Sequence, residues 1–421
     1  MERYKEYKKS VVPGMKEIPS HWKEILNGIL FKENVRKPNE NDIPLSLSQK
    51  DGLIPTDLMK ESSLKTSTYD NWKKVLKHDL VLNRFKAHLG VLMASDYEGM
   101  VSFHYGVYEP QLPLITKYYE LLYHTDIYKG IYAYSSNGMT VGLQNLSNIV
   151  FYSIKGIYPP LAEQEKIVSY LEDKTSKIDA YVADKEKEIE LLQELKQKTI
   201  ADAVTKGLNP DAKMKDSKTS LFGQIPFHWE ERKMKYCFSE RSEKNHPEEP
   251  ILCATQSQGV IPQSMYQNRV VVVNKGFEGL KFVKAGDFVI SLRSFEGGIE
   301  YAYYQGIISA AYTILTPLNA NNTDYFKFLF KSYPFIQVLQ TCVTGIREGQ
   351  NINYQMLGRN FLPLPPSDEQ QAIVAYIEER CEKIDKLASE LQSEIDYLKE
   401  YKQRLIADCV TGQVNVQNEM I

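Results

Sequence analysis

The stretch Pro159-Pro160-Leu161-Ala162-Glu163-Gln164-Glu165-Lys166-Ile167-Val168 occurs twice in this sequence of 421 residues. It returns as Pro365-Pro366-Ser367-Asp368-Glu369-Gln370-Gln371-Ala372-Ile373-Val374. Further on, Ile200-Ala201-Asp202-Ala203-Val204-Thr205 returns as Ile406-Ala407-Asp408-Cys409-Val410-Thr411. The shift stays at about 206 residues, roughly half of the chain, which indicates a duplication of the whole chain.

Both copies of this stretch predict a long helix with a coiled-coil seam. Apolar residues recur at two heptad positions, although Lys185 and Thr199 interrupt the first copy. The proline pair prevents a helix from running in from upstream, and Gly207 and Gly412 mark the far ends. A helix of about 40 residues is about 60 Å long, which suits a spacer. The expected seam residues are Leu171, Ile178, Val182, Ile189, Leu192, Ile377, Ile384, Leu391, Ile395, Leu398 and Leu405.

The repeat predicts an α+β protein in which two globular α/β domains alternate with the two helices. A two-fold operation that exchanges the halves also exchanges the helices, so they should pair as an antiparallel coiled coil. The expected order is a first domain, a first helix, a polar linker, a second domain, a second helix and a tail, at residues 1–158, 159–206, 207–218, 219–364, 365–412 and 413–421.

Composition limits the class of protein. The first nine residues are too charged for a signal peptide, no long apolar run follows, and the five cysteines show no pairing pattern. We therefore expect a reduced cytoplasmic protein without a membrane segment. The formal net charge is −3; the two helices carry about −8, which leaves about +5 on the rest. The globular parts can thus approach phosphate, although this alone does not show DNA binding.

Each globular half contains a short apolar strand that runs into a polar loop with glycine. The two versions are Asp79-Leu80-Val81-Leu82-Asn83-Arg84-Phe85-Lys86-Ala87-His88-Leu89-Gly90 and Asp287-Phe288-Val289-Ile290-Ser291-Leu292-Arg293-Ser294-Phe295-Glu296-Gly297-Gly298. Basic and amide side chains beside glycine suit contacts with phosphates and base edges, and an ordinary hairpin is the alternative. The DNA-contact candidates here are Arg84, Lys86, His88, Arg293 and Ser294.

A second matched set precedes each proline pair. Gln144-Asn145 corresponds to Gln350-Asn351, and Arg347 lies just upstream of the latter. Glutamine and asparagine can read adenine and arginine can read guanine, whereas a capping turn before a strand is the alternative for the Gln-Asn pairs. We include Gln144, Asn145, Arg347, Gln350 and Asn351 among the DNA-contact candidates.

Motifs for catalysis and cofactors are missing from the sequence. There is no P-loop, no dinucleotide-binding glycine motif and no HExxH, and no Ser/His/Asp or Cys/His arrangement stands out. Trp22 and Trp229 are expected to be core anchors, and their neighbours His21 and His228 are not expected to be metal ligands. We predict neither a catalytic nor a metal site.

At this point the chain resembles the specificity subunit of type I restriction–modification enzymes. The residues that carry the resemblance are the two PP-x-x-EQ-x-x-IV motifs, the two helix ends Ile-Ala-Asp-x-Val-Thr, Gly286 to Ile299, and Thr344 to Asn353. The resemblance implies that two target-recognition domains each read half of a bipartite double-stranded DNA site, and that the helices recruit two methyltransferase subunits. Restriction (nuclease/translocase) subunits are an optional addition. S-adenosylmethionine, ATP and Mg would belong to those partners, with no cofactor in this chain.

Three other readings stay open. The chain could serve modification only, without a nuclease partner, or be a silent specificity subunit. It could instead be a coiled-coil scaffold for protein interactions, which predicts no salt-dependent binding to duplex DNA. A nuclease acting alone is the least favoured reading, because nothing distinguishes its scattered carboxylates as a site.

Overall fold

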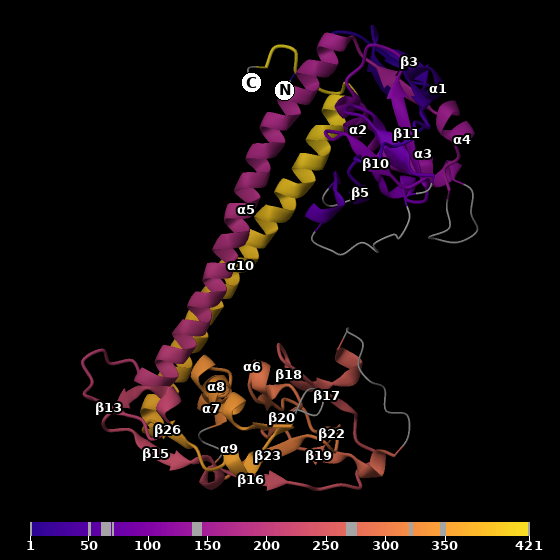
Figure 1. Cartoon of the computed structure of the whole chain (residues 1–421). Helices are drawn as coiled ribbons and strands as arrows, with labels where there is room; N and C mark the ends of the chain where they lie inside the picture. Colours follow the sequence, from indigo (N-terminus) through magenta and orange to yellow (C-terminus); the bar gives the residue numbers. More distant parts are fainter. Residues whose placement is uncertain are drawn as a thin grey trace. The chain divides into compact units, whose positions relative to one another are not determined.

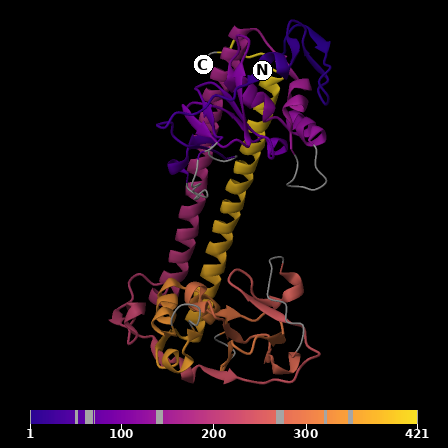
Figure 2. The same cartoon turned by 45° about the vertical axis from the view of Figure 1, so that its right-hand side comes forward.

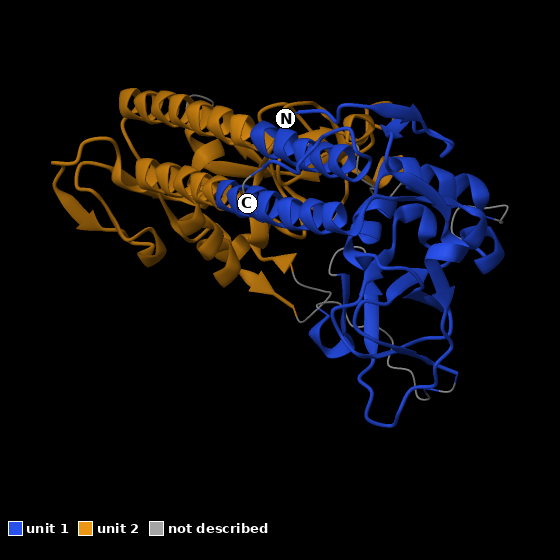
Figure 3. Ribbon diagram, turned by 90° about the horizontal axis from the view of Figure 1, so that it is seen from above, with its two compact units in different colours: residues 1–185, 393–421 blue, residues 186–392 orange. Residues whose placement is uncertain are grey.

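The computed structural model describes residues 2–48, 52–59, 69, 71–136, 145–266, 276–319, 323–345 and 351–419. The chain divides into two compact units, with residues 1–185 and 393–421 in unit 1 and residues 186–392 in unit 2 (Figures 1 and 3). The boundaries fall inside the two long helices, α5 (Leu161–Lys206) and α10 (Ser367–Val410), and not at their ends. Each unit therefore contains one globular domain together with part of each helix.

In unit 1 the globular domain runs from the N-terminal strands to the start of α5. Its elements are β1 (Tyr7–Lys9), β2 (Glu17–Pro19), β3 (Lys23–Leu26), α1 (Asn27–Leu30), β4 (Phe31–Glu33), β5 (Leu45–Ser48), β6 (Gly52–Pro55), η1 (Thr56–Leu58), β7 (Lys73–Val75), β8 (Leu80–Asn83), η2 (Ala87–Leu89), β9 (Leu92–Ala94), β10 (Gly99–Val101), β11 (Tyr105–Pro110), α2 (Thr116–Tyr123), α3 (Asp126–Ser135), α4 (Asn148–Ser153) and β12 (Lys155–Tyr158).

In unit 2 the domain lies between the two long helices in the sequence. Its elements are β13 (Met214–Asp216), η3 (Ser220–Phe222), β14 (Gln224–Pro226), β15 (Glu230–Lys233), η4 (Met234–Tyr236), β16 (Phe238–Arg241), β17 (Leu252–Thr255), β18 (Gly259–Pro262), η5 (Gln263–Met265), η6 (Phe277–Gly279), β19 (Lys281–Val283), β20 (Phe288–Ile290), α6 (Ser294–Gly297), β21 (Glu300–Tyr301), β22 (Gly306–Ile308), β23 (Thr313–Pro317), α7 (Thr323–Leu329), α8 (Tyr333–Thr341), β24 (Val343–Thr344), β25 (Asn351–Ile352), α9 (Tyr354–Leu357) and β26 (Phe361–Leu364).

The two domains repeat one antiparallel frame. The central sheet has the order β4-β11-β8-β9 in unit 1 and β16-β23-β20-β21 in unit 2. The flanking pairs also correspond: β5-β6 to β17-β18, β7-β10 to β19-β22, and β3-β12 to β15-β26. The apolar runs at β8 and β20 are buried on both faces because a hydrophobic cluster lies on each side of the sheet. The duplication predicted from the sequence is therefore present in the topology.

The long helices begin after the proline pairs. Gln164 N–H donates to the Pro160 carbonyl and Gln370 N–H to that of Pro366. Both helices end before a glycine in the left-handed region, with φ of 71° at Gly207 and 73° at Gly412. A residue with a Cβ would be strained there, so the glycines stop the helices.

A carboxylate anchors the start of each long helix to its own domain. Glu163 accepts hydrogen bonds from the Trp22 indole N–H (2.9 Å), the Tyr4 hydroxyl (3.0 Å) and His21 Nε2 (2.7 Å). In unit 2, Glu369 accepts from Trp229 Nε1 at 3.0 Å and pairs with His228 at 2.8 Å. Both tryptophans are buried core residues, and both histidines are bound to a carboxylate.

A tyrosine in each domain binds the end of the opposite helix. The Tyr118 hydroxyl donates to the Val410 carbonyl (2.7 Å) in unit 1, and the Tyr325 hydroxyl donates to the Val204 carbonyl (2.9 Å) in unit 2. Each domain thus holds the first turn of one long helix and the last turns of the other. This reciprocal arrangement is what an internal two-fold repeat requires.

The helices pair antiparallel, as predicted (Figures 1 and 2). Lys402 Nζ lies 2.6 Å from Asp179 Oδ1 in unit 1, and Lys196 Nζ lies 2.7 Å from Asp385 Oδ2 in unit 2. The two ion pairs exchange under the repeat. Of the predicted seam residues, six are buried (Leu171, Val182, Ile377, Leu391, Ile395 and Leu405) and five are half-buried (Ile178, Ile189, Leu192, Ile384 and Leu398).

Two segments expected to be simple connections are built into the domains. Strand β13, inside the predicted polar linker, pairs with β14 as β1 pairs with β2. The tail after α10 is also packed, because Asn415 forms a β-bridge with Glu2 and Val416 is buried. The polar linker and the tail therefore also contribute to the domains, since strand pairing satisfies backbone groups in both.

Candidate nucleic-acid interface

The loops that carry the DNA-contact candidates follow β8 in unit 1 and β20 in unit 2. A buried aspartate precedes each strand and ties it to an arginine. Arg36 Nη1 lies 2.9 Å from Asp79 Oδ2, and Arg241 Nε lies 2.9 Å from Asp287 Oδ2. Burial raises the pKa of the Asp79 carboxyl, although its hydrogen bond from Leu76 N–H and its pairing with Arg36 oppose this. These pairs fix the strand that delivers the loop.

Arg84 lies at the end of β8, where its side chain is held by the protein. Its guanidinium pairs with Glu33, whose carboxylate also pairs with Lys73 at 2.8 Å and accepts a hydrogen bond from Asn148. Asn148 in turn accepts from the Tyr108 hydroxyl at 2.6 Å. Only 22% of the Arg84 side chain is exposed, so its first role is to join β4, β8 and α4, and its contact with DNA stays a prediction.

The other unit 1 candidates differ in exposure. Lys86 is exposed and precedes η2, whereas His88 is half-buried, with a buried Nδ1 that has no hydrogen-bond partner among the described residues. Asn145 is exposed and lies next to Arg84 in space, because Leu146 N–H donates to the Arg84 carbonyl at 3.0 Å. Gln144 lies outside the described residues.

In unit 2, Arg293 is exposed and stands immediately before α6. Ser294 is buried, and its hydroxyl accepts a hydrogen bond from Ser291 N–H at 2.8 Å, so it closes the turn that presents Arg293. Asn351 is exposed in β25, opposite Thr344. Arg347 and Gln350 lie outside the described residues.

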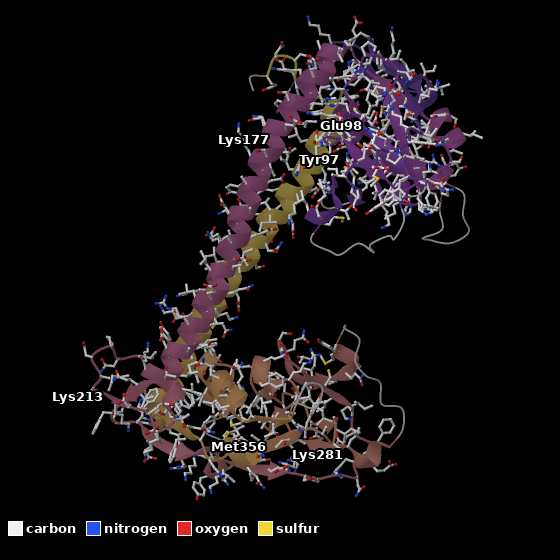
Figure 4. The ribbon with its side chains drawn as sticks, viewed as in Figure 1. Tyr97, Glu98, Lys177, Lys213, Lys281 and Met356 are labelled. Carbon is white, nitrogen blue, oxygen red and sulfur yellow. The ribbon has the colours of Figure 1, made fainter. Side chains whose placement is uncertain are left out.

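An ion pair with a buried carboxylate supports the far end of the Arg293 loop. Lys331 Nζ lies 2.5 Å from Glu300 Oε1 and donates to the Gly297 carbonyl at 2.9 Å. Burial raises the pKa of the Glu300 carboxyl to about 7, although Lys331 opposes the rise. The same frame is supported by Lys73 and Lys281, which donate to the carbonyls of Tyr105 and Tyr312 (Lys281 is labelled in Figure 4).

Three aromatic side chains next to the unit 1 candidates were missed at the sequence level. Phe85 and Phe103 are 41% and 51% exposed, and the ring of His104 lies 5.8 Å and 3.9 Å from their ring centroids. We name Phe85, Phe103 and His104 the aromatic cluster. Its members come from two turns about 18 residues apart, so no local pattern could reveal it.

A metal site, a membrane span and a reactive thiol are the other features to consider in the described residues. Within them, no group of three or more His, Cys, Asp or Glu side chains could hold a metal ion, and no helix is long and apolar enough to cross a membrane. The five cysteines are free thiols and buried. Burial raises the pKa of Cys237 to about 11 and that of Cys409 to about 12, which makes them unreactive.

The comparisons with known proteins agree with this architecture. Residues 24–191 match the family model of the type I restriction modification DNA specificity domain. The fold resembles a chain solved in work on complex assembly and conformational transition of the type I R-M system, with TM-score 0.69 and 16% identity over 94% of this chain and 99% of that one. It also resembles the HsdS subunit from Thermoanaerobacter tengcongensis, with TM-score 0.54 and 16% identity over 96% of this chain and 100% of that one.

Proposed function

We infer that this chain, which carries a type I restriction–modification DNA specificity domain, is the DNA-recognition subunit of such a system. One observation carries the inference: a single frame is built twice, and the loops that follow β8 and β20 differ in their exposed side chains. Two unlike readers on one repeated frame suit a bipartite DNA site with two different halves. Each domain would read one half through its loops.

The helices would set the spacing of the readers and recruit partners. A helix of 46 residues is roughly 69 Å long, and the seam and the two reciprocal ion pairs join it to its partner helix. The helices also expose large apolar side chains, with Tyr397 73% and Leu191 55% exposed. Such residues are typical of surfaces that bind another protein. We propose that two methyltransferase subunits dock there.

The chain itself would be non-catalytic. S-adenosylmethionine, ATP and Mg would be bound by partner subunits, and restriction subunits would be an optional addition. The cytoplasmic location expected from the sequence belongs to the same proposal. About +5 of formal charge outside the helices suits an approach to phosphate.

Sequencing of the methylated bases of the genome, with and without the gene for this chain, tests the function. We expect one split motif to lose its methylation on deletion. Survival of every methylated motif would contradict the proposal. Binding of duplex DNA by the complex with its methyltransferase partners should also weaken steeply with salt, by roughly 0.9 decade of affinity per decade of salt for each phosphate contact. A protein-interaction scaffold would show no such dependence.

A further inference from the structure

The aromatic cluster of unit 1 lies at one end of the central sheet. Strands β8 and β11 are paired there, with Asn83 opposite Tyr105, so the residues after Asn83 and before Tyr105 meet in space. Phe85 follows β8, whereas Phe103 and His104 precede β11. Two exposed phenylalanines that both contact the ring of His104 form a surface able to bind an apolar or aromatic group.

Short turns present the rings. Asn83 Oδ1 accepts from Phe85 N–H at 3.2 Å, and the Asn83 carbonyl accepts from Lys86 N–H at 3.0 Å. On the other side, Tyr105 N–H donates to the Ser102 carbonyl at 3.0 Å. The rings are therefore held by closed turns beside the sheet, which lowers the entropy cost of binding.

The charges around the cluster favour an anionic partner, such as nucleic acid, over a basic one. The segments Asn83–His88 and Ser102–Tyr105 contain two basic residues, Arg84 and Lys86, two histidines and no acidic residue. The nearby Glu33 is already shared between Arg84 and Lys73. Exposed Lys86 beside exposed rings is the combination that binds phosphate and base together.

Unit 2 builds the same turns with other side chains. Ser294 N–H donates to the Ser291 carbonyl at 3.2 Å, and Tyr312 N–H donates to that of Ser309 at 3.1 Å. The pattern of turn bonds places Arg293 at the position of Phe85, and the sequence places Ala310 and Ala311 at those of Phe103 and His104. Because the turn forms in unit 2 with two alanines, the aromatic rings are not needed to build it.

We propose that the aromatic cluster contacts bases of the half-site read by unit 1 through stacking and apolar contacts, at the place where unit 2 uses Arg293. This rests on the proposed function and adds the recognition chemistry of each half. In duplex DNA an apolar side chain can contact the thymine methyl group or insert between two base steps, whereas arginine reads guanine by paired hydrogen bonds. The two halves of the site are then read by different chemistry on equivalent turns.

The test uses the full chain in complex with its methyltransferase partners and duplexes carrying the split motif found by methylation sequencing. One duplex is intact, and in two others a single half-site is scrambled. The double variant Phe85→Ala/Phe103→Ala is compared with Phe227→Ala, which removes a 66% exposed phenylalanine elsewhere, in unit 2. Arg293→Ala is the reciprocal variant.

We expect the double variant to bind the intact duplex about 5- to 100-fold more weakly, with an unchanged slope of affinity against salt. It should lose discrimination at one half-site only, and Arg293→Ala should lose it at the other. Phe85→Leu/Phe103→Leu should recover part of the affinity, since leucine keeps apolar contact but cannot stack. Thermal unfolding of each variant complex confirms that it is folded.

Two results would overturn the inference while leaving the function intact. In the first, the wild-type complex binds the split motif in a salt-dependent way, and the double variant binds it with the same affinity. The other is a double variant that fails to co-purify with the methyltransferase, which would make the cluster a protein-docking surface. A wild-type complex that shows no preference for any methylated motif would instead remove the proposed function itself.

Discussion

The carboxylate of Glu163 is predicted to be a main determinant of unit 1 stability. It accepts three hydrogen bonds, and one donor, the indole N–H of Trp22, belongs to a side chain with 0% exposure. Glu163→Ala leaves that donor unsatisfied, at a cost of about 1–3 kcal/mol. The half-exposed His21 contributes at most about 1 kcal/mol, because water screens the pair. The expected loss of unfolding free energy is about 1–4 kcal/mol.

Calorimetry and hydrogen exchange can measure this loss in unit 1. For a unit of about 200 residues, each kcal/mol lowers the melting temperature by about 2–4 °C, so a decrease of about 2–16 °C is expected. Glu165→Ala is the matched control, since it removes the same charge from an exposed position two residues along the same helix. Equal melting temperatures for the two variants would refute the reasoning.

Three further predictions follow from the packing. Glu300→Gln should flatten the pH dependence of unit 2 stability. The pKa of Glu300 is about 7 in the folded chain against an ordinary 4.5, so the wild type should lose stability as pH rises between those values. Urea unfolding at pH 5 and pH 8 would detect the difference between the wild type and the variant. Lys402→Glu should cost up to about 1 kcal/mol by repelling Asp179, and Asp179→Lys added to it should restore most of that in a double-mutant cycle. Gly412→Ala should destabilise the chain by at least about 1 kcal/mol more than Gly223→Ala in urea unfolding. Both glycines have positive φ, but only the added Cβ at Gly412 would lie 2.4 Å from a proline ring. Equal losses of stability would show that the proline ring moves to accommodate the Cβ.

The loops show where reasoning from the sequence stops. Arg84 and Arg293 are both arginines in glycine-bearing loops after a buried strand, and the sequence treats them alike. The structure separates them, because Arg84 pairs with Glu33 whereas Arg293 is exposed. Glu33 is 51 residues from Arg84, and only the strand order β4-β11-β8 brings the two together. Pairing between distant strands leaves no local pattern to read.

The sequence alone determined the duplication, the two long helices, their seam and the glycines that end them. These features depend on local rules: a heptad repeat, a proline that blocks helix entry and a left-handed residue at the helix end. The tertiary structure decided which loop side chains are already bound, that linker and tail are paired into sheets, and that Phe85 meets His104. These outcomes depend on strand register and side-chain burial, which are set by contacts between residues far apart in the chain.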